Sequence, residues 1–147
     1  MCKTEHIGMY INIASHQIRR STDSFLARYG LSGIQGRILG HLDRAAQRGE
    51  DVFQRDIEKS FGIRRSSVTS VISHLEENGF VARCPVPGDA RLKKLILTEK
   101  GEQTSRQVKS LLSEFESSLN SCFTEQERKE LLRMLKILID NTEHMEV

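Results

Sequence analysis

Residues 54–79 read QRDIEKSFGIRRSSVTSVISHLEENG, and this stretch carries the signals that decide the fold. A short helix is predicted over residues 54–61, because Ile57 and Phe61 lie four positions apart on one face. A glycine then interrupts the pattern, and a second helix is predicted over residues 65–78, where an Asn-Gly pair ends it. The apolar stripe of the second helix consists of Val68, Val71, Ile72 and Leu75. Two helices joined by a short turn that contains glycine predict a helix-turn-helix.

After this pair of helices the hydrophobic period changes to that of a strand. Residues 80–84 and 94–97 are short strand-like runs, and residues 85–91 between them are rich in turn formers. We therefore expect a β-hairpin with a basic, exposed tip. A hairpin in this position predicts a winged helix-turn-helix.

The segments on either side are also predicted to be helical. A stripe at helical spacing predicts a long first helix that ends near Gly30, and Ser32–Gln35 reads as a capping box for a second. Thr98 is placed to cap a further helix, and Thr124–Glu127 is a capping box for the last one. The order of elements predicts a mainly α fold with a small β-hairpin wing. The stripes are Ile7, Ile11, Ala14, Ile18 and Phe25; Ile34, Ile38, Leu39 and Leu42; Val108, Leu111, Leu112, Phe115 and Leu119; and Leu131, Leu132, Leu135, Leu138 and Ile139.

The charge of the 147-residue chain is nearly balanced overall but uneven along its length. Its 22 basic and 20 acidic side chains give a formal charge of +2. Residues 1–53 hold 7 basic and 5 acidic side chains, residues 54–98 hold 8 and 5, and residues 99–147 hold 7 and 10. A basic middle and an acidic C-terminal part indicate separate roles. No apolar run could span a membrane and no signal peptide is visible, so we expect a cytoplasmic protein without a membrane partner.

The polar face of the second helix is one candidate for nucleic-acid contact. Short hydroxyl side chains let a helix approach the floor of the DNA major groove, and arginines grip phosphates or guanine. The alternative is an ordinary solvated helix face. The candidate residues on and beside this helix are Arg64, Arg65, Ser66, Ser67, Thr69, Ser70 and His74.

The hairpin is the other candidate, and its basic side chains are Arg91, Lys93 and Lys94. A long cationic side chain on a projecting loop can enter the narrow minor groove, where the potential is most negative. Asp89 is predicted to orient the Arg91 guanidinium by a bidentate pair. The alternative is a surface ion pair worth about 0–1 kcal/mol. Because this hairpin directly follows a helix-turn-helix, DNA binding is favoured.

These segments resemble the MarR family of bacterial transcription regulators. The resemblance rests on residues 54–58, 65–69 and 75–81, and on the wing and its sequel, DARLKKLILTEKG, at residues 89–101. The Asp-x-Arg followed by Leu-Thr-x-x-Gly is quite specific for that family, whereas the helix-turn-helix alone would match many winged-helix regulators. Length and helix order match over essentially the whole chain.

The resemblance implies a homodimer on a pseudo-palindromic operator, with one winged module on each half-site. It implies that Arg91 enters the minor groove, and that Gln54 and Arg55 match positions that touch the DNA backbone. Arg64 departs from the pattern, because related sequences often carry a short N-capping residue there. The second helix, over residues 65–78, is the recognition helix of this family. The resemblance implies that its contacts with bases or phosphates are made by Arg65, Ser66, Ser67, Thr69 and Ser70.

The acidic terminal helices fit a dimer core independently of the resemblance. Their leucine-rich faces are too wide for the central module to cover, and pairing two subunits would bury them. The alternative is a compact monomer with the helices folded back. The predicted division is an N-terminal dimerisation helix (1–30), a winged helix-turn-helix DNA-binding module (31–98) and C-terminal dimerisation helices (99–147), within one compact chain.

No motif for catalysis or for a cofactor is present, so we expect neither an enzyme nor a bound metal. His16 and His41 could meet in space as a metal sensor, which is the alternative. The cysteines, Cys2, Cys84 and Cys122, imply neither a disulfide framework nor a CxxC metal site. Cys84 and Cys122 are interpreted as small apolar fillers rather than sensors.

A small-molecule effector is the remaining partner that the resemblance implies, and it would release DNA by favouring another spacing of the reading helices. Tyr10, Arg19, Arg20 and Arg37 are either lining residues of its pocket or plain surface residues. The predicted function is a sequence-specific DNA-binding transcription regulator, most often a repressor in this family. A winged-helix module for protein–protein interaction and a thiol-based redox-sensing regulator stay open as alternatives.

Overall fold

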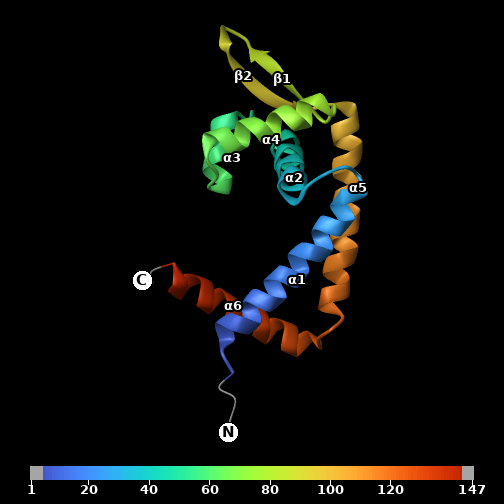
Figure 1. The fold of residues 1–147 in the computed structure, drawn as a ribbon, viewed down its shortest axis with the longest axis vertical. Coiled ribbons are helices and arrows are strands. Elements are labelled where there is room, and N and C mark those ends of the chain that lie inside the picture. Colours follow the sequence, from blue (N-terminus) through green and yellow to red (C-terminus); the bar gives the residue numbers. More distant parts are fainter. Residues whose placement is uncertain (1–4, 144–147) are drawn as a thin grey trace. The chain divides into compact units, whose positions relative to one another are not determined.

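The computed structural model describes residues 5–143, which form helices and one antiparallel hairpin (Figure 1). The predicted fold class, mainly α with a small β-hairpin wing, is confirmed. No helix in the described range combines the length and apolar character that crossing a membrane requires. The elements are α1 (Ile7–Ala27), α2 (Gly33–Gln47), α3 (Gln54–Phe61), α4 (Arg65–Glu77), β1 (Val81–Val86), β2 (Asp89–Leu97), α5 (Glu99–Asn120) and α6 (Glu125–Thr142).

The chain divides into two compact units, and the boundary lies between Ser110 and Leu111, inside α5. The first unit contains α1 to α4, the hairpin and the first part of α5. The second contains the rest of α5 and α6. The predicted boundaries near residues 30 and 98 divide the chain by role rather than by compactness, and they remain a prediction.

The core of the first unit is built around the stripes predicted for α2, α3 and α4, whereas the stripe predicted for α1 lies outside it and α1 contributes Leu26 instead. Helices α2, α3 and α4 supply its most deeply buried side chains, and the hairpin contributes Val81 and Leu95. Because α4 buries Val68, Ile72 and Leu75 on one side, its opposite face must point to solvent. The side chains with less than 2% exposure are Ile38, Leu39, Ile57, Val68, Ile72 and Leu75.

The predicted helix caps are present. In the box that opens α2, the Gln35 N–H donates to the Ser32 hydroxyl at 3.4 Å, and the Ser32 N–H donates to the Gln35 side chain at 2.8 Å. The box that opens α6 has the same form, with Thr124 and Glu127 exchanging bonds of 2.8 and 3.2 Å. The predicted starts of both helices are therefore confirmed.

The hairpin differs from its prediction in the length of its strands. The expected loop over residues 85–91 is mostly strand, because Pro85 pairs with Lys93 and Val86 pairs with Asp89. Only Pro87 and Gly88 form the turn, with Gly88 at φ +88°. Proline is tolerated at Pro85 because β1 is an edge strand, where a missing N–H need not break the pairing. The turn-forming residues therefore predicted the position of the hairpin correctly, but the predicted loop was longer than the observed turn.

The base of the hairpin is fastened to the start of α5. The Thr98 hydroxyl donates to the carbonyl of Gly79 at 2.5 Å and accepts the N–H of Gly101 at 3.0 Å. The Lys100 ammonium donates to the carbonyl of Asn78 at 2.7 Å and lies 4.4 Å from the centre of the Phe80 ring. These contacts fix the end of α4, the root of β1 and the first turn of α5 as one block.

Gly101 tests this block, because its backbone packs directly against that of Phe80. A Cβ atom at this position would overlap the Phe80 carbonyl oxygen and lie 3.3 Å from a Leu97 methyl group. We expect Gly101→Ala to lower the free energy of unfolding by about 1–3 kcal/mol. Urea unfolding at fixed protein concentration measures the change.

The matched control is Gly8→Ala in α1, where a Cβ would meet no atom within 4 Å. Since alanine favours a helix over glycine, this variant should unfold at the wild-type urea concentration or slightly above it. Equal stability of the Gly101→Ala protein and the control would contradict the close contact with Phe80.

Candidate nucleic-acid interface

Helix α4 presents its polar face to solvent, as the buried stripe requires. Arg64 stands at the N-cap of α4, where its side chain makes no capping hydrogen bond. The N–H groups of the first turn therefore have no side-chain acceptor, and such groups attract anions. The predicted contact residues on this helix are all exposed: Arg65, Ser66, Ser67, Thr69, Ser70 and His74.

Arg91 lies in an irregularity of β2 close to the hairpin turn. The register passes from Pro85–Lys93 directly to Val86–Asp89, so residues 90–92 have no partner in β1. A bulge of this kind bends the strand and redirects its side chains. Arg91 is exposed at the far end of the hairpin, where a projecting cation can reach a second surface.

Asp89 acts on Arg91 in a different way from the one predicted. Its Oδ1 accepts the backbone N–H of Arg91 at 2.9 Å. Among the ion pairs of the described residues there is no Asp89–Arg91 pair, so the predicted bidentate contact with the guanidinium is wrong. At a spacing of two residues, an Asp side chain readily bonds to the backbone, which forms a local turn. Asp89 therefore shapes the bulge and leaves the guanidinium free.

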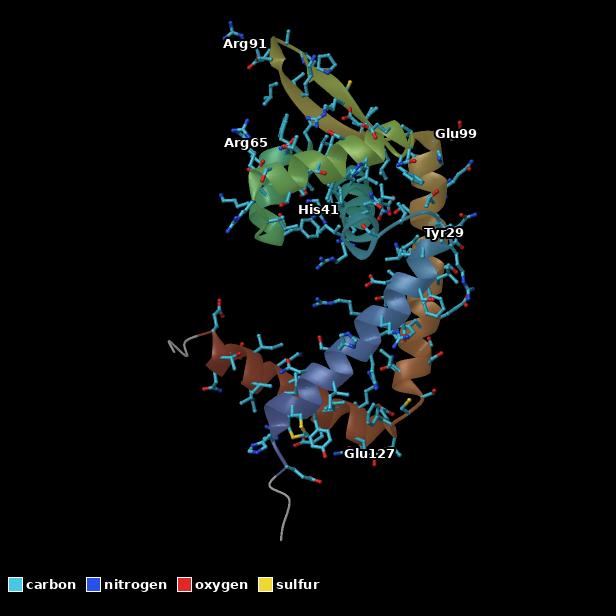
Figure 2. All side chains as sticks on the ribbon, in the orientation of Figure 1. Tyr29, His41, Arg65, Arg91, Glu99 and Glu127 are labelled. Carbon is cyan, nitrogen blue, oxygen red and sulfur yellow. The ribbon has the colours of Figure 1, made fainter. Side chains whose placement is uncertain are left out.

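Several cations on this side of the first unit have no carboxylate partner within the described range. Figure 2 shows the labelled side chains of Arg65 and Arg91 reaching outward on the same side of the module. Arg55 lies 5.5 Å from the centre of the Phe53 ring, which leaves its charge unneutralised. The predicted contact cations without an ion pair are Arg55, Arg64, Arg65, Arg91 and Lys93.

Lys94 is separated from these cations although it follows Lys93 in the sequence. Its ammonium donates to Asp51 at 2.9 Å, and this hydrogen bond raises the pKa of Lys94 above its ordinary value. Neighbouring residues on a strand point to opposite faces, which accounts for the different surroundings of the two lysines. Lys94 already has an anionic partner in the protein, unlike Arg91 and Lys93.

Gln54, Thr69, Glu76 and Arg83 form a hydrogen-bonded group that we call the Arg83 clamp. Arg83 on β1 donates from Nε to Glu76 at 2.9 Å and from Nη1 to the Gln54 side chain at 3.4 Å. Gln54 in turn donates from Nε2 to the Thr69 hydroxyl at 2.7 Å and to Glu58 at 3.2 Å. Gln54 and Thr69, which the sequence placed at the interface, are thus brought together by the structure.

Sequence reasoning did not find Glu76 and Arg83. The two residues lie seven positions apart across the end of α4, which is beyond the spacing of three or four that predicts pairs within a helix. Their meeting depends on how the chain turns at Gly79, where φ is +76°. The one signal in the sequence for this pair was a basic residue, Arg83, in the first strand-like run.

The histidines and cysteines show no sign of a metal or redox site in the described part of the chain. Residues 5–143 contain no group of three or more potential ligands. His41 packs edge-on against Phe61, with ring centres 5.8 Å apart. Cys84 is half-buried, and Cys122, which follows the end of α5, is exposed in the single chain. Their interpretation as apolar fillers stays a prediction. Cys2 lies outside the described residues.

The residues considered for an effector pocket do not line the hollow that the structure shows in the first unit. Tyr10, Arg19 and Arg20 are exposed on α1, and the Arg37 guanidinium lies 5.7 Å from the centre of the Phe61 ring. A hollow of about 320 Å³ lies elsewhere, between the end of α2, the loop after it and β2. None of the four residues lines it.

Comparison with known proteins identifies the family. Residues 29–92 match the model described as MarR family. The HTH-type transcriptional regulator PecS of Dickeya dadantii (strain 3937) is 31% identical over 130 residues, which cover 84% of this chain and 76% of PecS. The HTH-type transcriptional regulator BilQ of Clostridioides difficile (strain CD3) is 29% identical over 85 residues, so the match covers 58% of this chain and 57% of BilQ. The structure of the Staphylococcus aureus MepR–DNA complex has the same fold, with a TM-score of 0.80 at 24% identity over 93% of this chain and 98% of MepR. The chain belongs to the MarR family of winged helix-turn-helix transcription regulators.

Proposed function

We propose that the protein is a homodimeric repressor that binds a pseudo-palindromic operator and releases it when a small-molecule effector binds. The observation that carries the proposal is the grouping of unpaired cations around an exposed hydroxyl face of α4. Cations without partners on a folded surface are the usual footprint of phosphate contact. The family assignment supports the same activity, and it gives no support to catalysis.

In this proposal the two basic parts of the module bind different grooves. Helix α4 enters the major groove, where Ser66, Ser67 and Ser70 are short enough to let the helix approach the bases. Arg64 and Arg65 bind phosphates beside the uncapped first turn. Arg91 enters the adjacent minor groove from the bulge, which holds its guanidinium away from carboxylates. The half-sites of the dimer then lie about one helical turn apart.

The dimer is supported by large apolar side chains outside the module. Among the described residues, every exposed large hydrophobic side chain lies outside residues 31–98, except Ile96. Soluble proteins rarely leave such groups uncovered in quantity, and a twofold interface would cover the same faces on both copies. The exposed group comprises Ile7, Met9, Tyr10, Ile13, Ile18, Leu112, Phe123, Leu132, Met134, Ile137 and Ile139.

Replacing Arg91 tests the role of the wing. Arg91→Ala should weaken operator binding by about 1–3 kcal/mol, because it removes an unpaired cation from the groove. Fluorescence anisotropy with a duplex enriched from a random pool by the wild-type protein measures this affinity. Measured over a series of salt concentrations, the slope of log K against log salt should also become shallower by about 1 for each lost phosphate-type contact.

Arg106→Ala on α5 is the matched control, since it removes the same charge from an exposed position outside the predicted module. It should leave both the affinity and the salt slope near their wild-type values. Equal affinities of the wild-type and Arg91→Ala proteins would remove the wing from the proposed interface. A wild-type slope close to zero would instead favour the alternative of a protein-binding module.

Sedimentation equilibrium tests the dimer. The wild-type protein should have twice the chain mass of 16.8 kDa at micromolar concentration. Leu132 and Ile139 lie two turns apart on α6 and are 46% and 63% exposed. The double variant Leu132→Glu, Ile139→Glu should shift the mass towards 16.8 kDa, because burying two carboxylates in an apolar interface is costly.

The control for the dimer is Gln126→Glu with Lys136→Glu, which adds carboxylates at exposed polar positions of the same helix. It should sediment as the wild type does. A wild-type mass of one chain at all concentrations tested would contradict the dimer, whatever the variants do.

A further inference from the structure

We propose that Arg83 is a positioning residue, and that the Arg83 clamp fixes the recognition helix and the wing at the spacing that the operator requires. The inference rests on the proposed function, since it concerns how the same surface meets DNA. Its distinctive consequence is that a carboxylate, Glu76, supports binding to a polyanion.

The clamp joins the first strand of the wing to both helices of the helix-turn-helix. Arg83 lies on the first strand of the wing, Gln54 begins α3, Thr69 lies in the second turn of α4 and Glu76 lies near its C-terminal end. The Thr69 hydroxyl extends this series of hydrogen bonds, because it donates to the carbonyl of Arg65 at 2.9 Å, in the first turn of α4. One guanidinium therefore connects the wing to both ends of the recognition helix.

The hydrogen bonds of the clamp occupy the polar groups that the sequence had offered to DNA. The Gln54 amide donates both its protons, to Thr69 and Glu58, and its oxygen accepts from Arg83. The Thr69 hydroxyl proton is donated to the Arg65 carbonyl. Neither side chain has a free donor for a phosphate, so each holds α3 and α4 together, and base reading is left to the serines of α4.

Partial exposure of the ion pair indicates that the clamp sets geometry more than stability. The side chains of Arg83 and Glu76 are 32% and 31% exposed. Ion pairs at this degree of exposure contribute little to folding, so variants of the pair should remain folded. Without the clamp, the wing is still held by Val81 and Leu95 in the core and by the Lys94–Asp51 pair, but β1 loses its side-chain link to α3 and α4. Binding would then have to restore the angle between wing and recognition helix at an entropic cost.

Glu76 separates positioning from direct electrostatics, because the two predict effects of opposite sign. If charge alone mattered, removing a carboxylate near DNA would strengthen binding. It would also free the Arg83 guanidinium to contact a phosphate. If the clamp sets the geometry, removing that carboxylate loosens Arg83 and weakens binding.

The experiment compares Glu76→Gln with Glu77→Gln in the full-length protein. Glu77 is the exposed neighbour on α4, and its side chain makes no hydrogen bond or ion pair with the described residues. The two variants make the same charge change, but only Glu76→Gln breaks a contact. The probe is the duplex enriched from a random pool by the wild-type protein, and a scrambled duplex reports non-specific binding. Thermal unfolding confirms that both variants are folded.

We expect Glu76→Gln to bind the enriched duplex about tenfold more weakly, the equivalent of one charge-assisted hydrogen bond. Glu77→Gln should bind as tightly as the wild type or more tightly. Both variants should bind the scrambled duplex at least as well as the wild type, because non-specific binding does not depend on the wing angle. A merely structural role of Glu76 would instead weaken binding to both duplexes together.

Arg83→Lys provides the second variant. Lysine keeps the charge but lacks the planar fork that donates to Glu76 and Gln54 together. It should weaken binding to the enriched duplex about threefold or more, with the salt slope of the wild type retained. A direct phosphate contact predicts that lysine binds as well as arginine.

The outcomes distinguish the clamp from the function on which it rests. If the wild type enriches a duplex and Glu76→Gln binds it as tightly as the wild type does, the clamp is overturned and the proposed function stands. If the wild-type protein enriches no sequence, operator recognition and the clamp fail together.

Discussion

The burial of one face of α4 is the constraint on which the rest of the interface depends. Val68, Ile72 and Leu75 have at most 1% exposure, and they lock the rotation of this helix against α2 and α3. With the rotation fixed, the helical period leaves the serines and Arg65 no orientation except outward. The surface proposed to meet DNA is thus determined by the core, and a change in the apolar stripe would turn the whole polar face.

The basic side chains of the hairpin differ in whether they have a carboxylate partner, and this difference does not follow residue type. Arg83 and Lys94 have carboxylate partners at 2.9 Å, and each ties one strand of the hairpin to the rest of the module. Arg91 and Lys93 have no such partner in the described chain, and they lie near the free end of the same hairpin. Half of the basic side chains of the wing therefore attach it, and the other half are available to a ligand. A count of net charge cannot make this distinction.

The sequence predicted the parts of this structure that depend on local rules. The capping boxes at Ser32 and Thr124, the bounds of α3 and the buried stripe of α4 follow from spacing along one helix, and they agree with the structure. What it missed has two causes. For Asp89, a contact with the backbone N–H of Arg91 and a contact with its guanidinium have the same spacing of two residues, so spacing alone did not choose between them. The Glu76–Arg83 pair depends on the path of the chain around Gly79, which no helical spacing rule covers.

The glycine contacts of the first unit bear on how the proposed effector could act. A Cβ at Gly36 of α2 would lie 2.8 Å from a methyl group of Leu26 in α1, and one at Gly101 would overlap the backbone at Phe80. Helix interfaces packed this closely do not deform gradually, because their side chains fit together in one arrangement. The clamp also joins the wing to the recognition helix, so few elements of the module can move relative to one another. An effector that releases DNA should therefore displace the two modules of a dimer as rigid bodies, changing the distance between the α4 helices rather than their shape.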